Sequence, residues 1–331
     1  MSPRSMVPVG VVGLSPAWDA RYRPALQSLR ARIAVRAVYD PVLSRADQAA
    51  SELGAQAVDG MRVLARRDDI RALLVFDTGW AGTEALHLLC AAGRPMFVGG
   101  ALTADEGALK TLGEASVACG AMIMPELGQR YTPATCRLRE LMATRLGRPM
   151  QIQIEASAPA VPRDGQPLGR HPWDEFVSRL ADWCCYVVPT PPSEVAVHTQ
   201  NGSGSEAIRF SFARPRSGGE SPFVDVTLRT EQAVPADEAL PPIYRVRCER
   251  GEAEVRSSHR IIWRTDRDEA DESLASERSD LQVMLDHFCR RVVGGLIPVA
   301  DLGDLRRSHR LARAASESMR TGAPVHLNGQ A

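Results

Sequence analysis

The chain has 331 residues, of which 44% are hydrophobic and 24% are charged, and its formal net charge is zero. This composition is that of an ordinary globular protein, and the length suits roughly two domains. The balanced charge gives no indication of nucleic acid or an anionic membrane as a partner, and no apolar run approaches the roughly 20 residues that a membrane span needs.

The seven cysteines show no CxxC pair and no spacing typical of a metal site. The adjacent pair Cys184 and Cys185 is more typical of buried packing than of redox chemistry, because a free cysteine behaves as a small hydrophobic side chain. The N-terminal residues lead directly into a predicted strand and lack a cleavage pattern for a signal peptide. We therefore expect a reduced, cytoplasmic protein without a structural metal.

The first 125 residues predict alternating strands and helices. Continuous apolar runs indicate strands buried on both faces, at 7–14, 34–41, 72–77, 95–98 and 121–124. Helices are predicted at 23–33, 45–54, 83–92 and 104–119. Ser44 is the expected cap of the second helix, which closes on Gly54. Repeated βα units predict a doubly wound parallel sheet, which binds ligands at the carboxyl ends of its strands.

The second half of the chain has a different pattern. Apolar and polar residues alternate with period two, which predicts an antiparallel sheet with one face toward water. The predicted strands are 150–157, 194–199, 207–214, 223–229 and 244–250, with a short last strand at 324–327. The predicted helices are 174–188, 277–293 and 302–321.

Several stretches along the whole chain carry a resemblance to known proteins. They are "GVVGL", "AVYDP", "LHLLCAAGRPMFV", "ELGQRYTPATCRLRELMATRLGRPMQIQI" and the C-terminal segment from "ERSDLQVMLDHFCRRVV" to "PVHL". Together they resemble the glucose–fructose oxidoreductase, inositol dehydrogenase and MocA family (Gfo/Idh/MocA). The resemblance implies an α/β protein with an N-terminal Rossmann domain, residues 1–125, and a C-terminal α+β domain, residues 126–331, with a large open, mainly antiparallel sheet.

The same resemblance implies a function. Members of this family are NAD(P)-dependent oxidoreductases that act on a sugar, a polyol or a related secondary alcohol. They commonly form homo-oligomers through the open face of the second sheet. In this chain the C-terminal helices, residues 277–321, are candidates for docking back on the first domain.

The phosphate-binding loop departs from the dinucleotide fingerprint. A G-x-G-x-x-G sequence would begin at Gly13, but Ser15 replaces the second glycine and Trp18 the third. The second glycine lets the backbone approach the pyrophosphate, and the third lets the helix pack on the strand. Gly13, Leu14 and Ser15 are the candidate phosphate contacts. A plain connection between a strand and a helix explains this loop about as well.

Two further strand ends hold candidate cofactor contacts. Asp40 could bind both ribose hydroxyls of NAD and would repel a 2′-phosphate, although an Asp-Pro pair can also simply end a strand. NAD is therefore the expected cofactor, if any dinucleotide binds. Asp77, Thr78 and Trp80 follow the strand at 72–77. Trp80 could stack on a nicotinamide or a sugar, or it could fill the place where one would bind.

The catalytic lysine that the family resemblance implies is absent. The family carries Glu-Lys-Pro where this chain has Gly99, Gly100 and Ala101, and Gly99 is retained as a candidate cofactor contact. Lys110, the single lysine of the chain, lies about two turns into the next predicted helix and should point away. Arginine cannot replace an acid–base amine. Losing an acid–base group typically costs ~10²–10⁴-fold in rate.

The resemblance places the remaining catalytic candidates on the helix at 174–188. The family motif has an aspartate and, four residues later, a histidine; here they are Asp182 and Tyr186, on one helix face. Tyr186 would move the proton and Asp182 would orient it. A tyrosine can act as a base near neutral pH only when a cation lies close. Packing is the other explanation of Tyr186.

Two functions therefore remain open from the sequence. The first is an NAD-dependent oxidoreductase that acts on a CH–OH group of a sugar-like substrate. The second is a catalytically inactive member of the family that serves as a nucleotide-binding, sugar-binding or assembly module. Four departures at one cleft favour the second function: Ser15, Trp18, the altered loop after Asp77, and Gly100.

Overall fold

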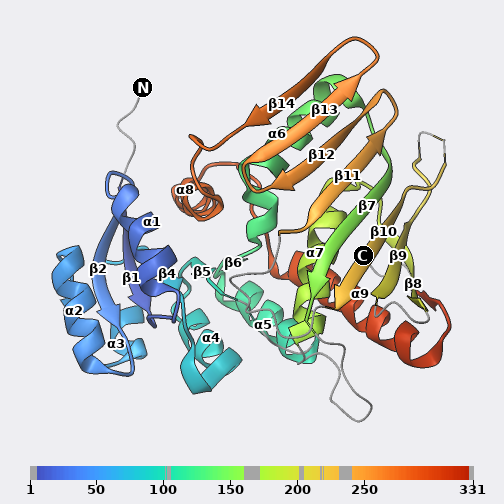
Figure 1. The fold of residues 1–331 in the computed structure, drawn as a ribbon. Coiled ribbons are helices and arrows are strands. Elements are labelled where there is room, and N and C mark those ends of the chain that lie inside the picture. The colour runs from blue at the N-terminus through green and yellow to red at the C-terminus, as the bar shows by residue number, and fades with distance from the viewer. Residues whose placement is uncertain are drawn as a thin grey trace. The chain divides into compact units, whose positions relative to one another are not determined.

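The computed structural model of the chain divides into two compact units. Unit 1 comprises Met1–Gly128 and Asp280–Arg306, and unit 2 comprises Gln129–Ser279 and Arg307–Ala331. The structure describes residues 6–100, 102, 106–159, 172–200, 205–216, 218, 220–230 and 241–327. Each unit is built around one β-sheet (Figure 1).

Unit 1 contains a six-stranded sheet with the order β3-β2-β1-β4-β5-β6, in which all neighbours are parallel. The apolar runs form its central strands because both faces of these strands are buried. The strands are β1 (Val7–Val12), β2 (Ile33–Tyr39), β3 (Gln56–Ala57), β4 (Ala72–Val75), β5 (Met96–Val98) and β6 (Ile123–Pro125). The predicted Rossmann-type doubly wound sheet is confirmed.

The helices of unit 1 differ from the predicted ones at both ends: α1 ends at Ser28 instead of residue 33, and α4 at Cys90 instead of residue 92. The prediction that Ser44 caps the second helix is wrong, because α2 begins at Leu43. The N–H of Val42, just before the helix, instead donates to Asp40 Oδ1 at 2.9 Å. Gly54 ends α2 in the left-handed conformation, as predicted. The helical elements are the π-helical turn η1 (Trp18–Tyr22), α1 (Arg23–Ser28), α2 (Leu43–Leu53), α3 (Met61–Ala65), the 3₁₀ turn η2 (Gly79–Ala81), α4 (Gly82–Cys90), α5 (Glu106–Cys119) and α8 (Asp280–Val292).

A row of aromatic rings runs through unit 1 from η1 to α8. Tyr22 stacks on Phe76 with ring centroids 4.1 Å apart, and Trp18 lies 6.0 Å from the same ring. Phe97 continues the row, 6.3 Å from Phe76 and 6.1 Å from Phe288. Trp18 and Tyr22 are buried. Trp18, which stands where the fingerprint has its third glycine, is thus part of the core.

Unit 2 contains a nine-stranded sheet with the order β14-β13-β12-β11-β7-β10-β9-β8-β15. Only the pair β7–β10 is parallel among the strand pairs described, so the sheet is mixed and mainly antiparallel, as predicted. The strands are β7 (Pro149–Ala158), β8 (Pro192–Gln200), β9 (Ser205–Phe212), β10 (Phe223–Thr230), β11 (Ile243–Cys248), β12 (Gly251–Ser257), β13 (Arg260–Thr265), β14 (Glu269–Ser273) and β15 (Val325–His326).

Helices cover one face of the unit 2 sheet. Trp173 and Trp183 on α7 are fully buried, and they share one apolar core with Ile154 on β7 and Leu311 on α9. Trp183 Nε1 donates to Thr135 Oγ1 at 3.0 Å, which satisfies its polar atom inside this core. The helical elements are η3 (Gly128–Tyr131), α6 (Pro133–Leu141), η4 (Met142–Leu146), α7 (Pro172–Val187) and α9 (Leu302–Thr321).

The opposite face of this sheet carries ion pairs between neighbouring strands. Side chains alternate along a strand, so residues between the core positions point to this second face. Arg245 pairs with Glu155 on one neighbouring strand and with Glu254 on the other. Arg260 pairs with Asp271 in the same way. We call this the outer face, and it carries Glu155, Arg209, Asp225, Arg245, Glu252, Glu254, Arg260, Arg264 and Asp271.

Candidate functional site

The carboxyl edge of the unit 1 sheet holds the predicted cofactor-binding residues. In chain order they are Gly13, Leu14 and Ser15 after β1, Asp40 after β2, Asp77, Thr78 and Trp80 after β4, and Gly99 after β5. Parallel sheets of this kind bind their ligands at this edge. The edge is therefore the candidate site of unit 1.

Gly13 is held against the chain that follows β4. Its φ is +73°, and its N–H donates to the carbonyl of Tyr39 at 2.8 Å. A Cβ at this position would lie 2.1 Å from the carbonyl oxygen of Asp77. The packing of unit 1 alone therefore requires glycine here, whether or not a phosphate binds.

Asp40 uses its carboxylate inside the protein. One oxygen accepts the N–H of Leu14 and the other the N–H of Val42, each at 2.9 Å. Arg45 Nη1 lies 3.6 Å from Asp40 Oδ2, and Arg45 Nη2 donates to the carbonyl of Leu14. The side chain of Asp40 is only 2% exposed. Asp40 thus ties the loop after β1 to the start of α2.

The loop after Gly13 presents few N–H groups to an anion. Its first N–H is the one bound by the buried carboxylate, and Pro16 has none. The N–H of Ala17 donates to Ser15 Oγ at 3.2 Å, and that of Trp18 to the Ser15 carbonyl at 2.9 Å. Four of the five residues 14–18 therefore offer no N–H to a phosphate. Phosphate loops depend on such groups.

The loop after β4 leaves its aromatic side chain in the open. Asp77 Oδ1 accepts the N–H of Gly79 at 2.7 Å, which shapes the turn into η2. Trp80 is 97% exposed. Its ring is therefore not packed against the rest of unit 1. Thr78 is half-buried beside this turn.

The strand end at Gly99 and Gly100 is crowded on one side and open on the other. A Cβ at Gly99 would lie 2.9 Å from Phe76 Cδ1 and 2.9 Å from the Tyr22 hydroxyl. The same Cβ would lie 3.2 Å from Glu126 Oε2. Gly100 has φ +70°, and a Cβ there would meet open space. The position where the resemblance implies glutamate is thus already occupied by side chains from elsewhere in unit 1.

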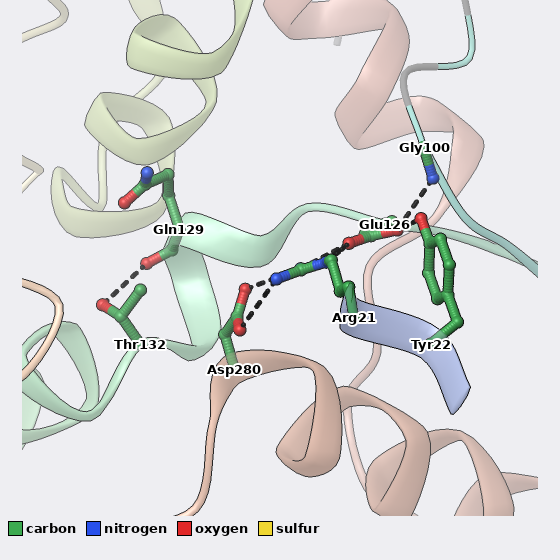
Figure 2. Close-up of polar contacts among 7 residues, drawn as sticks. All are labelled: Arg21, Tyr22, Gly100, Glu126, Gln129, Thr132 and Asp280. Carbon is green, nitrogen blue, oxygen red and sulfur yellow. Dashed lines mark hydrogen bonds and ion pairs between the residues drawn. The ribbon is translucent and has the colours of Figure 1, made fainter. Parts of the chain in front are cut away.

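Glu126, directly after β6, is the centre of a polar cluster (Figure 2). Its Oε2 accepts the Tyr22 hydroxyl at 2.7 Å and the N–H of Gly100 at 2.8 Å. Its Oε1 accepts Arg21 Nη2 at 2.5 Å and Nε at 3.1 Å. Burial and the neighbouring carboxylate raise the pKa of Tyr22, so its phenol stays a donor. Both oxygens of Glu126 are therefore bound within the protein.

Arg21 joins this cluster to the first residue of α8. Its Nη2 donates to Asp280 Oδ2 at 2.9 Å, and its Nη1 lies 3.4 Å from Oδ1 (Figure 2). Burial opposes the charge of Arg21, but the two carboxylates outweigh it and raise the pKa of this guanidinium. Sequence reasoning missed this cluster. The one local signal was an acidic residue, Glu126, placed directly after a buried strand.

In unit 2 the predicted orienting residue is held by an arginine. Asp182, on α7, accepts Arg130 Nε at 2.9 Å and Arg130 Nη2 at 2.5 Å, which is a bidentate pair. Both side chains are less than 9% exposed. Next to this pair, Thr132 caps α6 by accepting the N–H of Thr135, and its hydroxyl donates to the carbonyl of Gln129 at 3.3 Å (Figure 2).

Tyr186 lies one turn further along α7, between two guanidinium groups. The Arg139 guanidinium carbon is 4.4 Å from the centre of its ring, and that of Arg130 is 5.2 Å away. These are cation–π distances. Lys110 contributes to neither site, since its side chain is 65% exposed and lies 3.9 Å from Glu114 on α5. The cations nearest Tyr186 are therefore arginines of its own unit.

Neither a metal cluster nor a membrane span is found in the described part of the chain. Those residues contain no group of three or more His, Cys, Asp or Glu side chains arranged to hold an ion. Their helices are all too short or too polar to cross a bilayer.

Solved structures with this fold span nearly the whole chain, although no family model and no curated protein sequence matches it. UDP-N-acetylglucosamine 3-dehydrogenase GnnA from Acidithiobacillus ferrooxidans is 17% identical, with TM-score 0.71, over 95% of this chain and 98% of its own. An NAD binding oxidoreductase from Klebsiella pneumoniae is 13% identical, with TM-score 0.76, over 98% and 100%. A super-repressor mutant of Gal80p from Saccharomyces cerevisiae is 14% identical, with TM-score 0.77, over 97% and 98%.

The fold is that of the Gfo/Idh/MocA-type oxidoreductases. A doubly wound parallel sheet binds a dinucleotide at the carboxyl edge of its strands. In this chain that edge does not fit the group, because four of the five residues 14–18 offer no free N–H and the buried carboxylate of Asp40 is bound by two backbone N–H groups.

Proposed function

We propose that this chain is a catalytically inactive protein with a Gfo/Idh/MocA-type fold. It serves as a module that binds a sugar-like or nucleotide ligand, or as an assembly module. The observation that carries the proposal is the strand end at Gly99 and Gly100. The lysine that the resemblance implies is replaced by glycine there, and Glu126 and Tyr22 occupy the adjacent space. A carboxylate bound by four donor groups is not free to move a proton.

One solved structure of this fold is that of a super-repressor mutant of Gal80p, and the match covers 97% of this chain. The neighbour GnnA is described as a dehydrogenase of UDP-N-acetylglucosamine. These neighbours therefore suggest that unit 1 binds a sugar-like or nucleotide ligand without catalysing a reaction on it.

The first prediction concerns dinucleotide binding. Titration of the full chain with NADH or NADPH, followed by calorimetry and tryptophan fluorescence, should give no saturable binding at millimolar concentration. The physical reason is the missing donor set of the loop at 14–18. Trp80 is 97% exposed at this edge, so a stacked nicotinamide would quench its fluorescence, and Trp80→Phe identifies that contribution.

Asp40→Ala is the matched variant for this titration. If Asp40 is structural, the variant should lose about 1–3 kcal/mol of stability, because one buried and one partly buried N–H group lose their acceptor. If Asp40 instead binds a ribose, wild type should bind NADH at micromolar concentration and Asp40→Ala should lose that affinity. Micromolar NADH binding by the wild type together with its loss in Asp40→Ala would contradict the proposal that the protein is inactive and binds no dinucleotide.

The second candidate function is an NAD-dependent oxidoreductase that acts on a CH–OH group of a sugar or polyol. One observation favours it: Arg139 and Arg130 place positive charge over the ring of Tyr186, which partly replaces the cation that the missing lysine would supply. Asp182 is paired with Arg130 and would position that arginine. Turnover of a polyol with NAD that is lost in Tyr186→Phe would favour this function.

We also propose that the protein is a homo-oligomer formed through the outer face of the unit 2 sheet. The face carries arginines and acids in alternation, so it is self-complementary in charge when two copies are related by a twofold axis. Light scattering should show a dimer near physiological salt that dissociates at about 1 M salt, where the Debye length is about 3 Å.

Charge reversal tests this interface directly. Arg245→Glu, on the outer face, should weaken the dimer, because three carboxylates would then meet at one point. Arg23→Glu reverses an exposed pair with Glu52 in unit 1 and should leave the dimer intact. A monomeric wild type, or equal effects of both variants, would exclude the outer face as the interface.

A further inference from the structure

Two cysteines of unit 1 lie at neighbouring helix ends. Cys90 is the last residue of α4, and Cys119 is the last residue of α5. The N–H of Gly93 donates to the carbonyl of Cys90 at 2.9 Å, and a Cβ at Gly93 would lie 3.1 Å from the carbonyl oxygen of Cys119. The turn after Cys90 is therefore packed directly against the end of α5. Burial, and next the neighbouring Cys119 thiol, raise the pKa of the Cys90 thiol.

The two thiols differ in their access to solvent. Cys90 is fully buried in the core of unit 1, among side chains such as Leu86 and Leu112. Cys119 is exposed, and it is the one exposed member of the seven cysteines, all of which lie in the described residues. A dissolved oxidant therefore reaches Cys119 first, and Cys90 can react through Cys119 without leaving the core.

We propose that Cys90 and Cys119 form a reversible disulfide when the protein meets a peroxide. In the first step the Cys119 thiolate attacks hydrogen peroxide, the O–O bond breaks, and a sulfenic acid and water are produced. In the second step Cys90 attacks the sulfenic sulfur, the S–S bond forms, and the hydroxyl leaves as water with the Cys90 proton. Two thiols are oxidised by two electrons in total, and one peroxide is reduced to two waters.

The bond would close the stretch of chain that carries β5. This stretch, residues 90–119, contains the strand end at Gly99 and Gly100, which belongs to the candidate site. Oxidation would therefore restrict the unfolded and locally opened states of that strand end, while a cellular thiol would reverse it. The inference does not depend on whether the site binds a dinucleotide.

The experiment is peroxide treatment of the full native protein, followed by peptide mass analysis without reduction. We expect a linked pair of peptides that contain Cys90 and Cys119, a mass loss of two hydrogen atoms, and reversal by dithiothreitol. The bond should raise the Tm of unit 1 by several degrees, on the order of 5 °C. Cys119→Ser should abolish the link and the Tm shift, and because this residue is exposed the variant should fold normally.

Cys90→Ala is a second variant that tests the proposal independently of Cys119→Ser. Alanine is chosen because serine would place a hydroxyl in the core. In this variant Cys119 should proceed to the sulfinic acid instead of a disulfide. Cys136→Ser is the matched control, a half-buried cysteine of unit 2 that should leave the link unchanged. Overoxidised Cys119 in the wild type with no linked peptide, or a link from Cys119 to a second copy of the chain, would overturn the proposal.

Discussion

Replacing Asp182 with alanine should destabilise unit 2 by about 3–5 kcal/mol, because it leaves the buried guanidinium of Arg130 without its carboxylate. Two bonds are lost at once, at 2.9 Å and 2.5 Å. Urea unfolding followed by far-UV circular dichroism and tryptophan fluorescence measures this loss, since Trp173 and Trp183 are buried in the same core. Asp182→Asn keeps the shape and removes only the charge, so it should lose less.

The matched control is an exposed pair of the same chemistry. Asp268→Ala removes a carboxylate from Arg145, a pair of unit 2 outside the outer face, where the side chains are 47% and 62% exposed. The expected loss is at most about 1 kcal/mol, because water replaces the lost contact. If Asp182→Ala instead unfolds at the same urea concentration as the wild type and loses only enzymatic activity, Asp182 acts in catalysis and does not stabilise the fold.

The pattern of buried strands made the unit 1 sheet predictable. β1 and β4 are apolar at nearly every position because both faces of these strands are covered, which leaves a signal in a single sequence. Three strands of unit 2 left no such signal. Only one face of β12 and β13 is buried, at positions such as Ala253, Val255 and Trp263, and charged residues alternate with these; β14 is mostly polar. Their place comes from successive pairing of β12 with β11, β13 with β12 and β14 with β13, which is tertiary information.

The candidate site was predictable in position but not in its contacts. The sequence placed Gly13, Asp40 and Gly99 at strand ends, and the structure has them there. What Asp40 binds depends on the local backbone of Leu14 and Val42, which no spacing rule describes. The cluster at Glu126 could not be predicted from the sequence, because its members are far apart along the chain. Arg21 lies 105 residues from Glu126 and 259 residues from Asp280.

Gly13→Ala should destabilise unit 1 by about 2–5 kcal/mol in the absence of any ligand. The residue is in the left-handed region at φ +73°, which costs an L side chain about 1–2 kcal/mol. The added Cβ would also lie 2.1 Å from the carbonyl oxygen of Asp77, and relieving such an overlap costs about 1–3 kcal/mol more. Urea unfolding of the ligand-free protein measures the sum.

Gly54→Ala separates the two contributions to that loss. Gly54 has nearly the same φ, +65°, and a Cβ there would meet no atom within 4 Å, so only the backbone cost of about 1–2 kcal/mol should remain. The difference between the two variants is then the overlap with Asp77. A large difference means that the fold by itself demands the first glycine of the fingerprint, so its presence says nothing about a phosphate. Equal losses would mean that the chain after β4 moves freely, and Gly13 would again count as a sign of ligand binding.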